Sequence, residues 1–345
     1  MKIAILGAGI VGSSAAYYLS QNENVTIDLY DDDTHGGTKA AVGIVCPWIV
    51  QRRNKAWYAL VEAGANFYLK LFEDLEDASF ANRSGAIIVN EKRHDHLLAM
   101  AIERQKRNPI MGMVKEIRDT DKLPSSFKFE KAFEISGAFR VDGQKLLNVL
   151  HRKLKNTNFI HETTTLSNLM SKNYDKIIVC AGGRFNEAFD LEGYDVDQFP
   201  QKGMLLSYPY EANQYAMAIP KGEIDFLFNH DELVIGASHE IDFTHMDYEA
   251  DVAQDLIDQA TYYMPLPKVE YTTRIGLRSN NKLNLPFYGK LEPFDDIYIT
   301  GGLGSSGLSS GPIIGYRLAQ HILEDSVLDN RYDPKQFVSL KNPTP

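Results

Sequence analysis

Hydrophobic and polar positions at the start of the chain predict a strand, a helix and a second strand. Residues 2–6 form an apolar run typical of a buried strand, residues 12–21 are predicted as a helix, and residues 25–29 alternate as a second strand does. A strand–helix–strand unit of this kind places its two strands parallel in one sheet. The chain therefore opens on a predicted βαβ unit.

The clearest helical pattern follows a loop of small residues at about 34–43. Between residues 57 and 75, apolar side chains recur at spacings of three and four, so that one face is apolar over about five turns. Residues 109–140 are irregular, with several short apolar runs. The other elements predicted for this part are a strand at 84–90, helices at 91–108 and 144–154, and a buried strand at 175–180.

The second half of the chain begins with strand patterns and ends with a strand and a helix. Residues 203–237 have a β pattern, and residues 252–263 mark one face of a helix. A strand at 297–300 leads into a glycine-rich turn at 301–311 and a helix that starts near Pro312. Because βαβ features occur at the start, in the middle and at the end, we expect two domains that interleave along the chain.

Composition narrows the class of protein. The 345 residues suffice for about two domains, and 44% hydrophobic with 24% charged residues is typical of a globular protein. Asp and Glu (46) exceed Lys and Arg (36), and the net charge of −10 disfavours broad binding to nucleic-acid backbones or anionic membranes. Two cysteines, Cys46 and Cys180, cannot form a disulfide framework or a cysteine-rich zinc site, which fits a reducing compartment.

No segment of the sequence is expected to span a membrane. Residues 3–19 have about the length of a signal-peptide core, but they include three glycines and two serines. No predominantly apolar run reaches the roughly 20 residues that a membrane span needs. We therefore expect an unprocessed, cytoplasmic protein.

A glycine motif follows the first strand directly. Gly7, Gly9 and Gly12 fit G-x-G-x-x-G, in which the first glycine permits a tight turn, the second lets the backbone approach a pyrophosphate and the third lets helix and strand pack closely. The helix N-terminus then presents free N–H groups to the phosphates. Asp31, at the end of the second strand, is placed to bind ribose hydroxyls, although two further aspartates follow it. The motif predicts a dinucleotide site and leaves NAD and FAD open; the alternative is that the glycines serve packing alone.

Five segments occur in order along nearly the whole chain: GAGIVG at 7–12, GTKAAVG at 37–43, IIVCAGG at 177–183, GLR at 276–278 and GGLGSSG at 301–307. Together they resemble the glycine oxidase, D-amino acid oxidase and sarcosine oxidase superfamily of FAD enzymes. The resemblance implies an α/β fold, with a Rossmann-like FAD-binding domain of residues 1–80, 139–198 and 275–330. A smaller α+β substrate domain with an antiparallel sheet would comprise residues 81–138 and 199–274, and residues 331–345 would be a tail.

The resemblance also implies which residues bind FAD. Small residues in the second and third segments let the backbone pass close to the cofactor, and the helix after the last segment could direct its dipole at the anionic reduced flavin. The alternatives are an ordinary flexible loop, a simple tight turn and a glycine-rich connection of no special role. The implied residues are Gly7, Gly9, Ile10, Val11, Gly12, Asp31, Thr38, Lys39, Ala40, Ala41, Gly43, Ile44, Ala181, Gly182, Gly302, Leu303, Gly304, Ser305, Ser306, Gly307 and Leu308.

On the substrate side, the resemblance places a carboxylate-binding arginine at Arg278. A guanidinium holds a carboxylate bidentately and fixes its orientation; the alternative is a surface ion pair. Cys46, in the stretch expected near the flavin, and Lys202 are further candidates, although a buried structural thiol fits Cys46 as well. No general base and no metal site are identified, since orientation and a dry pocket suffice for this chemistry.

The activity that follows is oxidation of the C–N bond of a small amino acid or N-substituted glycine, by hydride transfer to flavin N5 and hydrolysis of the imine. Either O2 or a carrier could reoxidise the flavin. Ser305 and Ser306 stand where glycine oxidase has an arginine and an asparagine, which puts the particular substrate in doubt.

Two other functions stay open. The loop at 301–307 is also similar to the oxidoreductase domain of the tRNA wobble-uridine modification enzymes, which remove a carboxymethyl group from a carboxymethylaminomethyl-uridine. The basic and aromatic residues 51–58 could contact RNA, or could be a helix start with Trp57 in the core. The third possibility is an NAD-dependent dehydrogenase or binding module.

Overall fold

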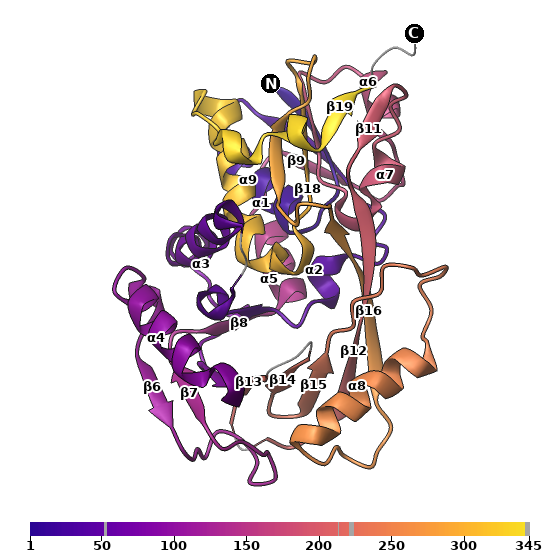
Figure 1. Ribbon diagram of the computed structural model, residues 1–345. Coiled ribbons are helices and arrows are strands. Elements are labelled where there is room, and N and C mark those ends of the chain that lie inside the picture. The colour runs from indigo at the N-terminus through magenta and orange to yellow at the C-terminus, as the bar shows by residue number, and fades with distance from the viewer. Residues whose placement is uncertain (52–53, 213, 221–223, 342–345) are drawn as a thin grey trace.

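The computed structural model describes residues 1–51, 54–212, 214–220 and 224–341. Two sheets organise it, one in the upper and one in the lower part of Figure 1. The long strands β12 (Phe199–Pro209) and β16 (Thr272–Asn280) pair along their length and run between the two parts.

The upper sheet is the predicted nucleotide-binding sheet. Its six strands lie in the order β17-β18-β10-β1-β2-β9, and all neighbours are parallel except β17 and β18. The middle strand is buried throughout its apolar run, as a strand covered on both faces must be. The strands are β1 (Lys2–Leu6), β2 (Thr26–Tyr30), β9 (Thr157–Ile160), β10 (Lys176–Val179), β17 (Phe287–Lys290) and β18 (Ile297–Gly301).

Three helices pack beside this sheet. Helix α1 (Ile10–Ser20) packs along α9 (Gly307–Glu324), and α9 packs against α3 (Lys55–Leu75). The contacts are close because Gly315 faces α1, where a Cβ would lie 2.7 Å from the carbonyl oxygen of Val11. The long apolar face predicted for residues 57–75 is the buried face of α3.

Helix α9 begins earlier than predicted. The sequence suggested a start near Pro312, because proline favours the first helical turn, but the helix starts at Gly307 and contains Pro312. Proline has no N–H to donate to the carbonyl of Leu308 four residues before it. The hydroxyl of Tyr68 on α3 donates to that carbonyl oxygen at 2.6 Å, so a side chain from a neighbouring helix replaces the missing donor.

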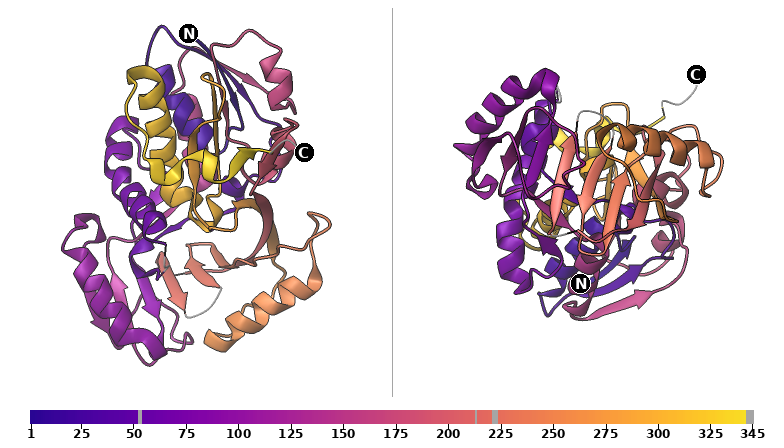
Figure 2. Two further views of the ribbon diagram at one scale, coloured as in Figure 1. Left: turned by 45° about the horizontal axis from the view of Figure 1, so that its top comes forward. Right: turned by 90° about the horizontal axis from the view of Figure 1, so that it is seen from below.

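The lower sheet has eight strands in the order β16-β12-β15-β14-β13-β5-β7-β6, with β13 and β5 parallel and the other pairs antiparallel. Its outer face packs against α8 (Ala250–Tyr263) in a second hydrophobic core. Figure 2, seen from below, shows these strands side by side. The further strands are β5 (Ala86–Val89), β6 (Val114–Ile117), β7 (Ala132–Ile135), β13 (Ala216–Pro220), β14 (Asp225–Phe228) and β15 (Glu232–Gly236).

The remaining strands form two small sheets. A three-stranded sheet has the order β3-β8-β4, and β11 pairs with β19. Within the residues predicted as a tail, β19 pairs with residues 194–196, and the assignment of 331–345 as a tail stays a prediction. The bounds are α2 (Gly37–Ala40), α4 (His94–Gln105), α5 (Gly143–Arg152), α6 (Leu166–Met170), α7 (Phe185–Ala188), β3 (Ile44–Val45), β4 (Ala81–Asn82), β8 (Phe139–Val141), β11 (Tyr194–Val196) and β19 (Val338–Leu340).

The α/β fold with a parallel Rossmann-like sheet and a separate, largely antiparallel sheet is as predicted. The division into two interleaved domains stays a prediction, and the boundary expected at residue 275 falls inside β16. Within the described ranges, no helix is long and apolar enough to cross a membrane. In the same ranges no group of three or more His, Cys, Asp or Glu residues could hold a metal ion.

Candidate active site

A cavity of about 790 Å³ lies where the two sheets meet. Its walls come from the C-terminal edge of the parallel sheet on one side and from β12, β14, β15 and β16 on the other. Ligands of open parallel sheets bind at this edge. The segments that line it include residues 6–11, 30–44, 180–184, 276–280 and 303–305.

The glycine motif forms one end of the cavity. Gly7 has a φ of +104°, and a Cβ there would lie 2.5 Å from the carbonyl oxygen of Cys180. A Cβ on Gly12 would lie 1.9 Å from the carbonyl oxygen of Gly7, so this residue serves the packing of helix on strand. A Cβ on Gly9 would meet only the Thr38 hydroxyl, at 3.5 Å. The space beside Gly9 is open, as close approach of a pyrophosphate requires.

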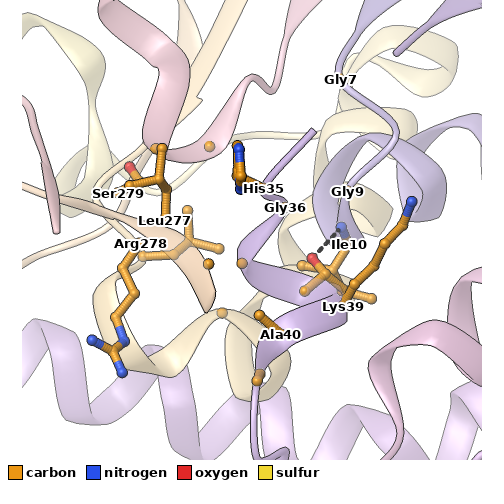
Figure 3. Close-up of a pocket in the computed structure, with 18 of the residues that line it drawn as sticks. Gly7, Gly9, Ile10, His35, Gly36, Lys39, Ala40, Leu277, Arg278 and Ser279 are labelled. Atoms are coloured by element: carbon orange, nitrogen blue, oxygen red, sulfur yellow. Dashed lines mark hydrogen bonds between the residues drawn. The ribbon is translucent and has the colours of Figure 1, made fainter. Parts of the chain in front are cut away.

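The first turn of α1 is open to an anion. Gly9 is its N-cap and supplies no side-chain cap, and the Ile10 N–H donates to the Thr38 hydroxyl at 3.1 Å (Figure 3). The carboxylate of Asp31 accepts the Ala8 N–H at 2.6 Å, which places it beside the glycine motif. A helix N-terminus and an adjacent ribose-binding carboxylate are the recognition elements of a dinucleotide.

The two aspartates after Asp31 have other partners. Burial would raise the pKa of Asp32, but hydrogen bonds from Thr34, Arg184 and Thr163 hold it well below its usual range. Asp33 forms an ion pair with Lys39. Of the three adjacent acids, Asp31 is thus the one that contacts the glycine motif, and its role in binding ribose stays a prediction.

The loop at 34–43 joins the two ends of the cavity. Gly36 forms a β-bridge with Leu277, whose N–H donates to the His35 carbonyl at 3.0 Å. A Cβ on Gly276 would lie 2.5 Å from that of Ala40. The segment that resembles an FAD-binding loop therefore packs directly on the strand that carries Arg278, and Figure 3 shows both in one view.

The N-terminus of α9 forms a further wall. A 3₁₀ turn (Gly304–Ser306) leads into the helix, and residues 303–305, 307 and 308 line the cavity. Ser306 points away from it, since its hydroxyl donates to the Leu303 carbonyl at 2.6 Å and accepts the Trp57 indole N–H at 3.3 Å. The hydroxyl oxygen of Thr300, also on this wall, is buried and has no hydrogen-bond partner among the described residues. An open cradle at Gly9, two helix N-termini and this unsatisfied hydroxyl fit FAD.

Arg278 lies at the other end. Its guanidinium packs against Gly203 of β12 and donates to the Ser238 carbonyl oxygen at 2.8 Å. Burial lowers the pKa of Arg278 to about 10, and the charge of Glu240 opposes this, so the group stays protonated at neutral pH. Within the described part of the chain, no carboxylate lies within ion-pair distance of it. Arg278 therefore offers a desolvated cation to the cavity.

Two predicted substrate residues do not line the cavity. On β12, Gln201, Gly203 and Leu205 line it, so the alternate Lys202 faces away, where its ammonium pairs with Glu240 and Glu249. The prediction for Lys202 is therefore corrected.

Cys46 is a buried thiol behind the wall, and burial raises its pKa. Gly12, Gly302 and Ser306 also support the wall and do not line it. The Gly302 N–H, for example, donates to the hydroxyl of Ser279 at 2.6 Å. The other predicted site residues all line the cavity, and the lining residues that the sequence did not single out include Gln201, Asp225, His239 and Asn280.

The basic and aromatic segment has a buried aromatic residue. Arg52 and Arg53 lie outside the described residues. Trp57 is 4% exposed and bonded to Ser306, which is the core position considered as an alternative. Tyr58 donates to Glu62, and Arg104 covers its ring at 3.9 Å.

Known proteins resemble this chain over most of its length. The family model described as FAD dependent oxidoreductase (DAO) matches residues 2–321. An uncharacterised oxidoreductase of Bacillus subtilis, YurR, is 30% identical over 363 aligned residues, 96% of this chain and 97% of that protein. The crystal structure of iminodiacetate oxidase from Chelativorans sp. BNC1 has a TM-score of 0.87 at 27% identity and covers 96% of this chain and 98% of that one. Glycine oxidase from Geobacillus kaustophilus shares the fold, with a TM-score of 0.79 at 17% identity and 99% of each chain covered.

Proposed function

Because the chain belongs to the DAO family of FAD-dependent oxidoreductases, we propose that it oxidises the C–N bond of a small amino acid or N-substituted glycine. The cofactor is FAD, so the NAD-dependent alternative is set aside. Bound FAD supplies the acceptor for the hydride that leaves the substrate carbon. Water then hydrolyses the resulting imine to a carbonyl compound and an amine.

The observation that carries the proposal is the state of Arg278. It is a protonated guanidinium, half-buried in the wall of the FAD cavity. Its hydrogen-bond partners are the Ser238 carbonyl oxygen and the Nδ1 of His239, and it has no ion pair within the described ranges. A desolvated cation of this kind is stabilised by a bound carboxylate, which a guanidinium holds through two parallel hydrogen bonds.

The wall around Arg278 would fix the orientation of such a substrate. Leu205, Ile44 and Leu303 give the cavity apolar surface, which excludes water from a bound amine. One carboxylate held bidentately, with the rest of the molecule against an apolar wall, sets the position of the carbon next to nitrogen. Iminodiacetate oxidase and glycine oxidase, whose structures resemble this one, are named for substrates with an N–CH2–COO⁻ unit.

Anaerobic reduction of the bound flavin tests the proposal. N-methylglycine, iminodiacetate, glycine and D-alanine would be added to the FAD-loaded enzyme, with dimethylamine and ethylamine as matched amines without the carboxylate. We expect at least one carboxylate-bearing amine to bleach the flavin and to yield a carbonyl product after hydrolysis. Bleaching by none of them would contradict the proposal.

The tRNA alternative gains no specific support. Its aromatic candidate, Trp57, is buried in the core, and the two arginines of the segment lie outside the described residues. Absence of accumulated carboxymethylaminomethyl-uridine in tRNA from a deletion strain would agree with the small-molecule proposal.

A further inference from the structure

Asp225 places a carboxyl group in the cavity on the same sheet as Arg278. It is the first residue of β14 and pairs with Gly236 of β15, which pairs in turn with Leu205 of β12. Residues opposite one another in an antiparallel ladder project from the same face. Because Leu205, Gly236 and Asp225 all line the cavity, the carboxyl group projects from its floor.

Among the residues that the structure describes, none compensates the charge of Asp225. Its carboxyl group has no hydrogen bond or ion pair within residues 1–51, 54–212, 214–220 and 224–341. Burial raises the pKa of Asp225 to about 7. Asp225 is half-buried, and a carboxylate that is partly removed from water without a partner is costly, so a cation brought by a ligand would stabilise it.

The other ionisable groups described around β14 do not compensate the charge of Asp225 either. The thiol of Cys46 is near Asp225, and the negative charge of Asp225 raises the pKa of Cys46 further. On β15, Glu232 lies at the far end of the strand, where Ser207 and Asn229 donate to it. Strand β13 has no ionisable residue, and Lys202 of β12 lies on the opposite face. Arg278 shares the cavity.

The two charged groups are separated by about the span of one substrate. The guanidinium of Arg278 packs against Gly203. Two strand spacings separate β12 from β14, and Gly203 lies two residues from the level of Asp225. These steps put the Cα atoms of Gly203 and Asp225 about 12 Å apart. A charged hydrogen bond of about 2.8 Å at each end leaves room between the two groups for a glycine unit.

We propose that Asp225 binds the amino nitrogen of the substrate whose carboxylate Arg278 holds, and takes a proton from that nitrogen before the C–H bond breaks. This rests on the proposed function. In the step, one N–H bond of the ammonium breaks, one O–H bond forms on the carboxylate and no electron is transferred. The nitrogen keeps the electron pair, which an ammonium lacks and which must drive hydride departure.

The pH dependence of kcat/KM tests this, because kcat/KM reports ionisations of free enzyme and free substrate. With Asp225, the enzyme accepts the abundant ammonium form, so kcat/KM rises to a plateau above about pH 7. The Asp225→Asn variant would react only with the neutral form of the amine, which is scarce near neutral pH. Its kcat/KM should be at least tenfold below wild type at pH 7.5 and should climb tenfold per pH unit up to the pKa of the substrate amine.

Binding gives a second readout. Methoxyacetate has the carboxylate but an ether oxygen in place of the amine, and its binding perturbs the flavin spectrum without turnover. Asp225→Asn should change the Kd for methoxyacetate by no more than about twofold at pH 8. The same substitution should weaken the binding of N-methylglycine, measured by flavin reduction, by about tenfold or more. Asp225→Glu should restore part of the preference, and Asp231→Asn, at an exposed turn carboxylate, should change neither ligand.

The outcomes separate the two proposals. N-substituted glycines could bleach the wild-type flavin while kcat/KM of Asp225→Asn falls at low pH in the same way as that of wild type. In that case the role of Asp225 is overturned and the proposed function stands. Equal weakening of methoxyacetate and N-methylglycine would show a merely structural role, and would also overturn it. If no carboxylate-bearing amine bleaches wild type, the proposed function itself fails.

Discussion

The guanidinium of Arg278 occupies the space that a side chain on Gly203 would fill. A Cβ on Gly203 would lie 2.6 Å from both terminal nitrogens and 2.7 Å from the central carbon of the guanidinium. The two residues lie on neighbouring strands, since Gly203 of β12 pairs with Gly276 of β16. The missing side chain at 203 therefore allows the arginine to lie across β12 and to reach the Ser238 carbonyl.

Gly203→Ala should displace that guanidinium without unfolding the protein. The clashing atoms are the end of a flexible side chain, so the backbone need not move. We expect KM for a carboxylate-bearing amine to rise at least tenfold, as for loss of a charged hydrogen bond, with FAD content and thermal midpoint nearly unchanged. Steady-state kinetics on the FAD-saturated variant measure this.

A double-mutant cycle supplies the control. If Gly203 acts through Arg278, adding Gly203→Ala to Arg278→Ala should cost little more than Arg278→Ala alone. Fully additive losses would show that Gly203 affects the cavity by another route.

Alanine substitutions at two glycines of the motif should affect different properties, the stability of the fold at Gly12 and the binding of FAD at Gly9. A methyl at Gly12 would collide with the Gly7 carbonyl at 1.9 Å, so Gly12→Ala should lower the unfolding temperature even without FAD. A methyl at Gly9 meets nothing closer than 3.5 Å, so Gly9→Ala should fold normally but bind FAD at least tenfold more weakly. Fluorescence titration with FAD and thermal melts of the apoprotein separate the two. Normal FAD affinity in Gly9→Ala would place the pyrophosphate elsewhere.

Tyr68→Phe should destabilise the protein by about 1–3 kcal/mol, the cost of leaving a buried polar group unsatisfied. The hydroxyl of Tyr68 is the donor to the Leu308 carbonyl, which cannot bond to Pro312. Urea unfolding of the FAD-saturated enzyme measures the change, and Tyr262→Phe, at a ring that is 74% exposed, is the matched control. An equal effect of both substitutions would exclude this role for Tyr68.

Asp225→Asn should stabilise the protein at alkaline pH. The pKa of Asp225 is about 7 when folded, against about 3.9 for an unfolded aspartate. The folded state binds more protons between these values, so the contribution of Asp225 to stability falls as pH rises from about 4 to 7 and stays low above it. Asparagine does not titrate.

We therefore compare the free energy of unfolding of Asp225→Asn with that of wild type at two pH values. The difference, variant minus wild type, should be about 1–3 kcal/mol larger at pH 8 than at pH 5. Urea midpoints at both values, with saturating FAD, measure the difference. The same difference at pH 5 and pH 8 would mean that Asp225 titrates normally.

Local pattern predicted the nucleotide-binding half of the fold well. Apolar runs and periodicity predicted strands β1, β2, β10 and β18 and helices α1 and α3. Each of these elements buries apolar residues that lie close together in the sequence. The start of α9 did not follow, since the partner of its unsatisfied carbonyl is Tyr68, some 240 residues away in sequence.

The substrate side depended more on strand pairing. The sequence suggested a strand from 203 or 204, whereas β12 starts at Phe199, and only that longer strand shows that Lys202 alternates away from the cavity. Asp225 directly precedes a short apolar run, and nothing in the local sequence marks it as a site residue. Its place in the cavity follows from the β14–β15 pairing.

The most direct test of the account is the dependence of flavin reduction on the substrate carboxylate, measured with Arg278 present and absent. Anaerobic rapid mixing would give the efficiency of flavin reduction by N-methylglycine, or by whichever amine of the panel is most active, and by its decarboxylated counterpart. We predict that Arg278→Ala retains FAD, lowers the efficiency for the carboxylate-bearing amine about 100-fold or more, and leaves the decarboxylated amine unaffected. An unchanged preference for the carboxylate in Arg278→Ala would contradict the account.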